Sequence, residues 1–314
     1  MQKVTKMKEF EGKTFSGERA QYFAQNESYK NCTFSGGESH LKHSQNIESL
    51  NSSFEYKYPF WNTKNTKVKN SIFHELAKSG LWYTKNFFLE DSKIEAPKEF
   101  RRSKGIFCRN VDFLNAAETM WSCRNIHLEN VKVFNGDYFA MNSSNFFAQN
   151  LELNGNYFLD GGSNIEIHNS KITSKDAFWN CKNVKVYDSI ISGEYLAWNS
   201  KNVKFINCQI ESDQGLCYVD GLTLENCTLK NTVLAFEYSK KINAKINGFV
   251  ESIKNPKSGK ISADKIGTLI LNPSRCKVKA TKINCPKIQK FYSKDPNENE
   301  NLYSGTAFSI PEIK

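Results

Sequence analysis

The sequence contains no apolar run of the roughly eighteen residues that are needed to span a bilayer. Residues 1–17 are polar and charged, without the apolar segment of an export signal. The nine cysteines are odd in number and include no C-x-x-C pair, which favours reduced thiols over a disulfide framework. These absences together predict a cytoplasmic protein that has no membrane partner.

Histidine is also scarce, and none of the five histidines has a ligand-like spacing to cysteine. We therefore expect neither a metal ion nor a cofactor. No block of five or six like charges occurs, although the formal net charge is +10. A positive balance permits an acidic partner such as nucleic acid or an anionic glycan, while a lysine-rich solvated surface gives the same number. Charge by itself leaves the partner open.

One four-residue signature, Asn or Asp followed three residues later by an apolar side chain, recurs twelve times. Successive copies lie 19, 20 or 21 residues apart. The apolar residue that ends each copy is called the anchor here. The anchors are Phe34, Phe54, Phe73, Ile94, Phe113, Val133, Leu153, Ile172, Ile191, Ile210, Leu229 and Val250. Such a period is typical of an architecture built from stacked repeats.

Apolar residues lie seven and five positions before most anchors, which is the two-residue period of a strand with one buried face. Units this short leave no room for a crossover helix, so each strand must pair in parallel with its counterpart in the next unit. The sequence predicts an all-β, single-stranded right-handed parallel β-helix (solenoid) of about 12 coils of 19–21 residues. Residues 1–28 are expected to form an N-terminal cap, 29–250 the coils, 251–292 C-terminal coils and a cap, and 293–314 a polar tail.

Asparagine or glycine stands eight residues before most anchors, and both residue types tolerate the left-handed conformation. This column and the signature asparagines are predicted to form two corners, with side-chain amides hydrogen-bonded along the stack. Three glycosylation-like sites, Asn31-Cys-Thr33, Asn51-Ser-Ser53 and Asn226-Cys-Thr228, coincide with the signature and are interpreted as ladder positions. Cysteines that share columns are interpreted as small core residues.

All five tryptophans lie twelve residues before an anchor: Trp61, Trp82, Trp121, Trp179 and Trp198. The column one residue earlier is apolar in ten units. Neighbouring residues of a strand point to opposite faces, so we expect the apolar column to be buried and the tryptophans to line an outward groove. Flat rings stack on sugars or bases. The alternative is a bend at which the rings fill a corner of the core.

Acidic residues beside the tryptophans are candidates for catalysis. Glu194 and Asp213 share a column on adjacent coils, so their backbones should lie ~5 Å apart, close enough to supply an acid and a base for glycosidic chemistry. Acids stacked at turns are also common solvent-exposed residues without a function. Further candidate catalytic residues are Asp137, Asp160 and Asp176, and further candidate ligand-binding residues are Tyr138, Tyr195 and Tyr218, with Arg101 and Arg102 expected to orient an anionic sugar.

Several runs, among them Glu95-Ala-Pro-Lys-Glu-Phe-Arg-Arg102 and Gly193-Glu-Tyr-Leu-Ala-Trp-Asn-Ser200, resemble a bacterial family of unknown function with a pectin-lyase-like β-helix. The resemblance extends from about Phe10 to Leu271 and implies the fold, but it brings no activity and no catalytic residues. Polysaccharide lyases on this fold often hold Ca²⁺ between clustered carboxylates, and no dense Asp cluster occurs in this sequence.

Two functions stay open at this point. The first is a carbohydrate-active or carbohydrate-binding protein for an acidic or small saccharide, in which the aromatic and carboxylate residues form the binding face. The second is a non-catalytic scaffold that binds a protein or nucleic-acid partner. The net charge of +10 slightly favours the scaffold, whereas the column of tryptophans beside acids favours the saccharide.

Overall fold

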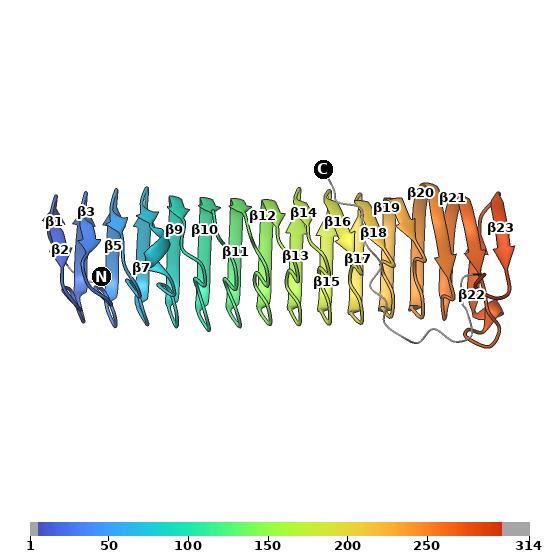
Figure 1. Ribbon diagram of the computed structural model, residues 1–314, viewed down its shortest axis with the longest axis horizontal. Coiled ribbons are helices and arrows are strands. Elements are labelled where there is room, and N and C mark those ends of the chain that lie inside the picture. Colours follow the sequence, from blue (N-terminus) through green and yellow to red (C-terminus); the bar gives the residue numbers. More distant parts are fainter. Residues whose placement is uncertain (1–5, 297–314) are drawn as a thin grey trace, which may run out of the picture.

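The computed structural model describes residues 6–296, which form a straight rod of stacked coils (Figure 1). Every strand pairing in these residues is parallel and joins one coil to the next. The strands are β1 (Lys8–Glu11), β2 (Thr14–Ser16), β3 (Gln25–Lys30), β4 (Thr33–Ser35), β5 (Gln45–Leu50), β6 (Ser53–Phe54), β7 (Lys64–Lys69), β8 (Ile72–Phe73), β9 (Lys85–Ile94), β10 (Lys104–Phe113), β11 (Arg124–Val133), β12 (Ser144–Asn154), β13 (Ser163–His168), β14 (Lys171–Thr173), β15 (Lys182–Tyr187), β16 (Ile190–Glu194), β17 (Lys201–Ile206), β18 (Gln209–Asp213), β19 (Asp220–Val233), β20 (Lys240–Lys254), β21 (Gly259–Ile270), β22 (Thr281–Asn284) and β23 (Ile288–Tyr292). Two short 3₁₀ helices, η1 (Glu75–Ala77) and η2 (Val278–Ala280), interrupt the coils.

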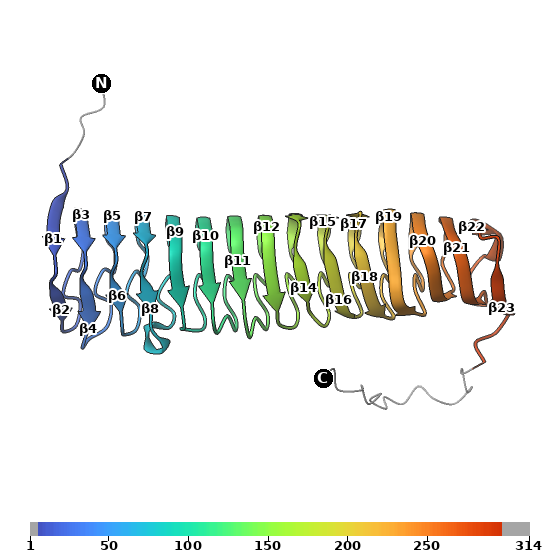
Figure 2. The ribbon, with the colours of Figure 1, turned by 90° about the horizontal axis from the view of Figure 1, so that it is seen from above.

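The predicted parallel β-helix is confirmed, and the repeat sets its register. Ile106 pairs with Ile126, which pairs in turn with Phe146, so equivalent positions of the repeat lie directly above one another. The rod has about fifteen turns rather than about twelve. In the segment expected as a cap, β1 and β2 already pair with β3 and β4, and the last strands extend the stack at the other end (Figure 2).

Residues 1–5 of the expected cap and residues 297–314 of the expected tail lie outside the described residues. No helix within residues 6–296 is long and apolar enough to cross a membrane.

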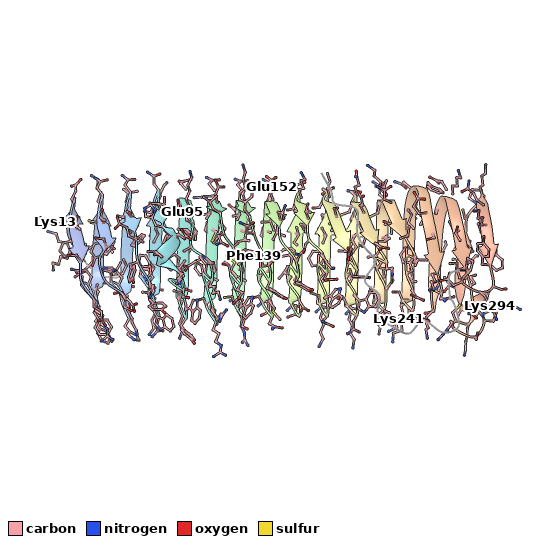
Figure 3. The ribbon with its side chains drawn as sticks, in the orientation of Figure 1. Lys13, Glu95, Phe139, Glu152, Lys241 and Lys294 are labelled. Atoms are coloured by element: carbon pink, nitrogen blue, oxygen red, sulfur yellow. The ribbon has the colours of Figure 1, made fainter. Side chains whose placement is uncertain are left out.

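The core is a column of anchors and inward strand residues that runs the length of the rod. The rings of Phe34, Phe54 and Phe73 stack at centroid distances of 5.0 and 4.6 Å. In Figure 3, Phe139 lies inside the rod, whereas Glu152 lies at its surface. Cysteines that share a column fill small gaps in the core, as expected, and the thiols of Cys208 and Cys227 donate to backbone carbonyls of the same or the preceding coil. Continuous burial of stacked apolar columns supplies the main stabilisation of such a solenoid.

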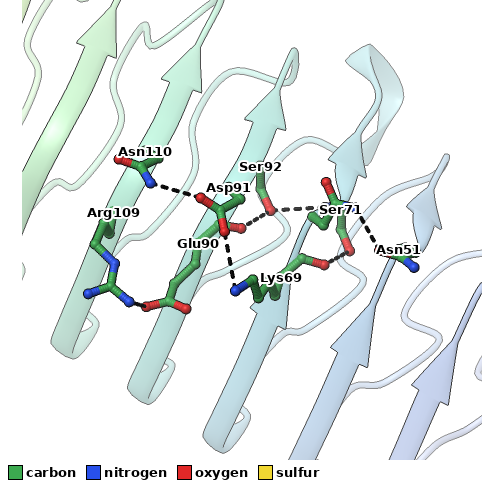
Figure 4. Close-up of polar contacts among 9 residues, drawn as sticks. Asn51, Lys69, Ser71, Glu90, Asp91, Ser92, Arg109 and Asn110 are labelled. Atoms are coloured by element: carbon green, nitrogen blue, oxygen red, sulfur yellow. Dashed lines mark hydrogen bonds and ion pairs between the residues drawn. The ribbon is translucent and has the colours of Figure 1, made fainter.

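Two asparagine ladders run along the corners. Each side-chain amide donates to the side-chain oxygen of the preceding coil, for example from Asn110 to Asp91 at 2.8 Å and from Asn70 to Asn51 at 2.6 Å (Figure 4). In the second ladder the amide of Asn65 donates to Asn46 at 3.0 Å. The backbone of these residues is left-handed, with φ near +50°, which asparagine tolerates better than most residues.

The third corner, which holds the tryptophans, is not a strand. Its alternate residues are left-handed, as at Asp176 (φ 57°), Phe178 (φ 59°) and Asn180 (φ 54°). Its amides bond to both neighbouring coils: Asp176 N donates to Glu194 O and Phe178 N donates to Phe158 O. All ten residues of the apolar column are buried as predicted. The residue before it is buried too in several coils, as at Ala177 and Leu196, so the side chains do not alternate as in a strand. The burial of the apolar column was predicted correctly, whereas the tryptophan column is half-buried rather than outward and the expected strand conformation was wrong.

Candidate functional site

The five tryptophans are half-buried, which lies between the two alternatives that the sequence left open. They divide into two clusters on the third corner. The first is the tryptophan–arginine stack, formed by Lys42, Trp61, Trp82, Arg101 and Trp121. The second is the aromatic–acidic patch, formed by Tyr157, Lys175, Asp176, Trp179, Glu194, Tyr195, Trp198 and Asp213.

In the tryptophan–arginine stack, Arg101 and Trp82 have partners within the protein, although the buried Arg101 Nε has no hydrogen-bond partner within residues 6–296. The guanidinium carbon of Arg101 lies 4.5 Å from the ring centroids of both Trp82 and Trp121. Its Nη2 donates to Glu118 Oε2 at 3.1 Å, and Trp82 Nε1 donates to the Lys98 carbonyl at 2.6 Å. A cation held between two rings is a stabilising contact within the protein.

Glu99 lies beneath this stack and is fully buried. Its two carboxyl oxygens accept hydrogen bonds from the amides of Gly80 (3.1 Å) and Leu81 (3.0 Å). Burial raises the pKa of this carboxyl well above its usual range, and the two amides oppose that rise. Glu99 was not among the residues predicted from the sequence. The one feature that sets it apart there is its position directly before an inward-facing phenylalanine, Phe100. The Glu99 carboxylate thus serves as the acceptor for two buried amides in place of backbone carbonyls, which is a structural role.

The rings of the aromatic–acidic patch continue along the same corner toward the C-terminus. Trp179 Nε1 donates to the Tyr195 carbonyl at 2.9 Å, which fixes the indole against the next coil. The rings of Trp179 and Trp198 lie 6.3 Å apart, and Trp198 lies 4.8 Å from Tyr218. Their outer faces form a shelf that is half open to solvent.

Glu194 and Asp213 are direct neighbours, as the repeat predicts, because they are paired residues of β16 and β18. Their surroundings differ. Lys175 Nζ lies 3.2 Å from Glu194 Oε2, so Glu194 is held by a cation. Asp213 is exposed, and no cation within residues 6–296 lies within ion-pair distance of it. Loss of hydration, and then the charge of Glu194, raise the pKa of Asp213.

Asp176 lies one layer deeper, with 2% of its surface exposed. Its Oδ1 is buried and has no hydrogen-bond partner. Burial raises the pKa of Asp176 to about 6, although the positive charge of Lys175 and a hydrogen bond with Tyr157 oppose the rise. Burial, followed by the charge of Asp176, also raises the pKa of Tyr157. Perturbed carboxyls of this kind gather at functional sites.

The structure therefore brings together only some of the predicted site residues. The structure brings Asp176, Glu194 and Asp213 together with Trp179, Trp198, Tyr195 and Tyr218, and Asp160 lies at the edge, accepting from Asn180 Nδ2 at 3.0 Å. Tyr138 stacks on Tyr157 at 4.7 Å and extends the shelf. The predicted site omits Tyr157 and Lys175, although the 19-residue spacing places them beside Asp176 and Glu194.

The other predicted residues lie elsewhere. Asp137 lies three coils before Glu194, and its Oδ1 accepts from the Asn156 amide at 2.7 Å. Arg101 lies four coils, ~19 Å, before Trp179, and Arg102 is exposed beside it. The structure thus does not bring these arginines to the acids, where they were expected to orient an anionic sugar. Residues 6–296 contain no group of three or more His, Cys, Asp or Glu side chains that could hold a metal ion.

No curated protein sequence matches this chain. Three solved structures show distant similarity. The A-module of the mannuronan C-5 epimerase AlgE4 from Azotobacter vinelandii is 7% identical over 85% of this chain and 88% of that chain, with a TM-score of 0.29. The surface adhesin PfbA of Streptococcus pneumoniae is 10% identical over 86% and 75%, with a TM-score of 0.28. Full-length QnrB1, a plasmid-mediated fluoroquinolone resistance protein, is 13% identical over 71% and 94%, with a TM-score of 0.21.

With TM-scores this low, the three structures carry no argument about what this chain does. A family model, in contrast, matches most of the chain, from residue 8 to residue 284, which spans nearly all of the described coils. The chain belongs to that family, which is described as "Protein of unknown function (DUF3737)".

Proposed function

We propose that the protein binds a saccharide on the aromatic–acidic patch and hydrolyses a glycosidic bond with Glu194 and Asp213. The observation that carries the proposal is the contrast between these two neighbouring carboxyls. Glu194 is held by Lys175 at 3.2 Å, whereas Asp213 is exposed, lacks a cation and has a raised pKa. Two adjacent carboxyls with different environments are the usual source of an acid and an ionised partner at one site.

The spacing favours a mechanism with retention of configuration. The backbones of paired residues on neighbouring coils lie ~4.8 Å apart, which allows the two carboxyls to approach the ~5 Å separation found in retaining glycosidases. Asp213 gives its proton to the leaving-group oxygen while the Glu194 carboxylate attacks the anomeric carbon and forms a glycosyl ester. Asp213 then takes a proton from water, whose oxygen attacks the anomeric carbon and releases Glu194. Lys175, 3.2 Å away, orients the Glu194 carboxylate.

The charge of the patch favours a neutral sugar. Four carboxyls, those of Asp160, Asp176, Glu194 and Asp213, surround a single Lys175, so an anionic sugar would be repelled. The faces of Trp179 and Trp198 offer a stacking surface for a pyranose ring. The cysteine pattern supports a cytoplasmic location, and that location favours a small saccharide over an extracellular polymer.

The test is hydrolysis of neutral and acidic oligosaccharides by the full-length protein, with products identified by mass spectrometry. We expect Glu194→Gln and Asp213→Asn each to lower turnover by about 10² to 10⁴. Glu118→Gln, which changes a carboxylate of the tryptophan–arginine stack, is the matched control and should keep full activity. If Glu194→Gln and Asp213→Asn retain full turnover while Trp198→Ala abolishes saccharide retention, the patch binds sugar without cleaving it.

A further inference from the structure

A column of cations lies three residues after the tryptophan column, on coils nearer the N-terminus than the aromatic–acidic patch. Lys64, Lys85, Lys104 and Arg124 occupy consecutive positions of one parallel ladder, at the first residues of β7, β9, β10 and β11. All four are exposed, and none has an acidic partner at ion-pair distance within residues 6–296. Like charges directly opposite one another destabilise a sheet, so this basic ladder lowers stability unless a polyanion covers it.

A stripe of aromatic rings follows the same strands. Phe88, Phe107, His127 and Phe147 are paired residues of β9 to β12 on the outward face, and their ring centroids are 5.9, 5.1 and 4.7 Å apart. Phe88 is 43% exposed, and the other rings are half-buried. The rings follow one another along the strands, and the guanidinium carbon of Arg109 lies 5.7 Å from the Phe107 ring centroid. Their partly exposed faces make this part of the sheet suited to stacking on a flat ligand.

The ladder and the stripe lie three residues apart on each strand, with the asparagine corner between them. Acidic residues occur on the other side of the stripe, where they are already paired. Glu90 binds Arg109 (Figure 4), and Glu129 lies 2.7 Å from His127 Nε2. The unpaired charge beside the rings is therefore positive.

We propose that this face binds single-stranded nucleic acid, with phosphates on Lys85, Lys104 and Arg124 and bases stacked on Phe88, Phe107 and Phe147. Sites for single strands combine cations that follow the backbone with rings on which successive bases stack. The ~4.8 Å coil spacing repeats both features along one line. A duplex keeps its bases within its own stack and cannot use the rings. The inference concerns a different face from the saccharide patch and does not depend on the proposed hydrolysis.

The chain contains a matched control further along the same two columns. On β15 and β17 the ladder positions are Lys182 and Lys201, but the outward positions three residues later are Lys185 and Lys204 instead of rings. Lys185 and Lys204 are paired with Glu166 and Glu225, and the ring of Tyr187 on β15 stacks on His168. These coils therefore repeat the basic ladder without phenylalanines beside it. Binding through charge alone would use them equally well.

The test is fluorescence anisotropy with labelled oligothymidine across a range of salt concentrations. Phe88→Ala with Phe107→Ala should weaken binding about tenfold or more and leave the salt slope unchanged. Lys85→Glu, Lys104→Glu and Arg124→Glu together should lower the slope of log K against log salt by about 2, for three lost phosphate contacts. The double variant Lys182→Glu and Lys201→Glu should change binding far less.

Circular dichroism establishes that each variant keeps the β-helix. No binding at low salt would overturn the proposal. Equal loss in the Lys182→Glu and Lys201→Glu variant would also overturn it, because charge alone would then explain binding. A duplex or a heparin fragment that competes as well as oligothymidine, with phenylalanine variants that bind normally, would identify a general polyanion surface instead.

Discussion

The tryptophan–arginine stack and the aromatic–acidic patch occupy equivalent corners of different coils, yet their charged groups are paired differently. In the stack, Arg101 lies between two indole rings and binds Glu118. In the patch, carboxyls of successive coils lie beside one another with one lysine among them. The comparison shows that a repeating fold presents equivalent positions many times, and that the pairing of charges at these positions differs from one set of coils to another.

The physical reason lies in the coil spacing. At ~4.8 Å, a residue interacts most strongly with the same column of its two neighbours, so substitutions in adjacent coils decide its environment. Arginine between tryptophans is stabilised, whereas Asp176 near Glu194 and Asp160 has a pKa raised to about 6, chiefly by burial. Groups that lower stability in this way are expected where function requires them.

The largest effect on stability is expected at Glu99, beneath the stack. Replacing it with leucine leaves the amides of Gly80 and Leu81 without an acceptor and should lower the free energy of unfolding by about 2–5 kcal/mol. Denaturant titration measures the loss. Glu99→Gln keeps one acceptor oxygen and should lower the free energy of unfolding less. An equal loss in both variants would contradict the assigned hydrogen-bond role.

The pH dependence of stability should distinguish the patch from the stack. The folded pKa of Asp176, about 6, lies above its ordinary value of 3.8. Its contribution to stability is therefore complete below pH 3.8 and is lost as pH rises through about 6, by roughly 1–3 kcal/mol in all. Asp176→Asn should thus unfold at higher denaturant than wild type at pH 8 and nearly equally at pH 4. Glu118→Gln, the stack control, should not show this gain at pH 8.

Saccharide binding should depend on one pair of tryptophans only. Trp198→Ala removes part of the stacking shelf and should weaken binding about tenfold, which corresponds to ~1.4 kcal/mol. Trp61→Ala, in the same column of the stack, should leave affinity unchanged. Calorimetric titration with a saccharide that the protein retains provides the measurement. Equal losses in both variants would mean that the two clusters form one groove.

The smallest effect is expected for Arg101→Lys. Lysine keeps the charge but loses the planar contact with Trp82 and Trp121, which should lower the free energy of unfolding by about 1 kcal/mol. Turnover of any saccharide should stay at the wild-type level, because Arg101 lies four coils from Trp179. A loss of turnover at full stability would instead place Arg101 in the binding surface and remove the distinction between the two regions.

Much of the fold could be predicted because the repeat length is fixed. The signature asparagines form ladders, and the apolar column before the tryptophans is buried, as expected. The first coil was missed because Gly12 (φ 60°) stands where other coils have asparagine; glycine adopts the same left-handed conformation but breaks the sequence pattern. From the sequence, the candidate site could be predicted only as columns that run along the rod. Residues four coils apart, such as Arg101 and Trp179, were therefore predicted to belong to one site.

The sequence by itself determined which residues are neighbours, because a parallel stack with a constant period converts spacing along the chain into contact between coils. Glu194 beside Asp213 follows from that rule alone. Tertiary structure decided how deeply each neighbour is buried and which charge it pairs with. The left-handed corner leaves the tryptophans half-buried, places Lys175 beside Glu194 and buries Asp176. These outcomes depend on side chains from three successive coils acting at once, and burial and charge pairing of that kind cannot be read from a single column of the repeat.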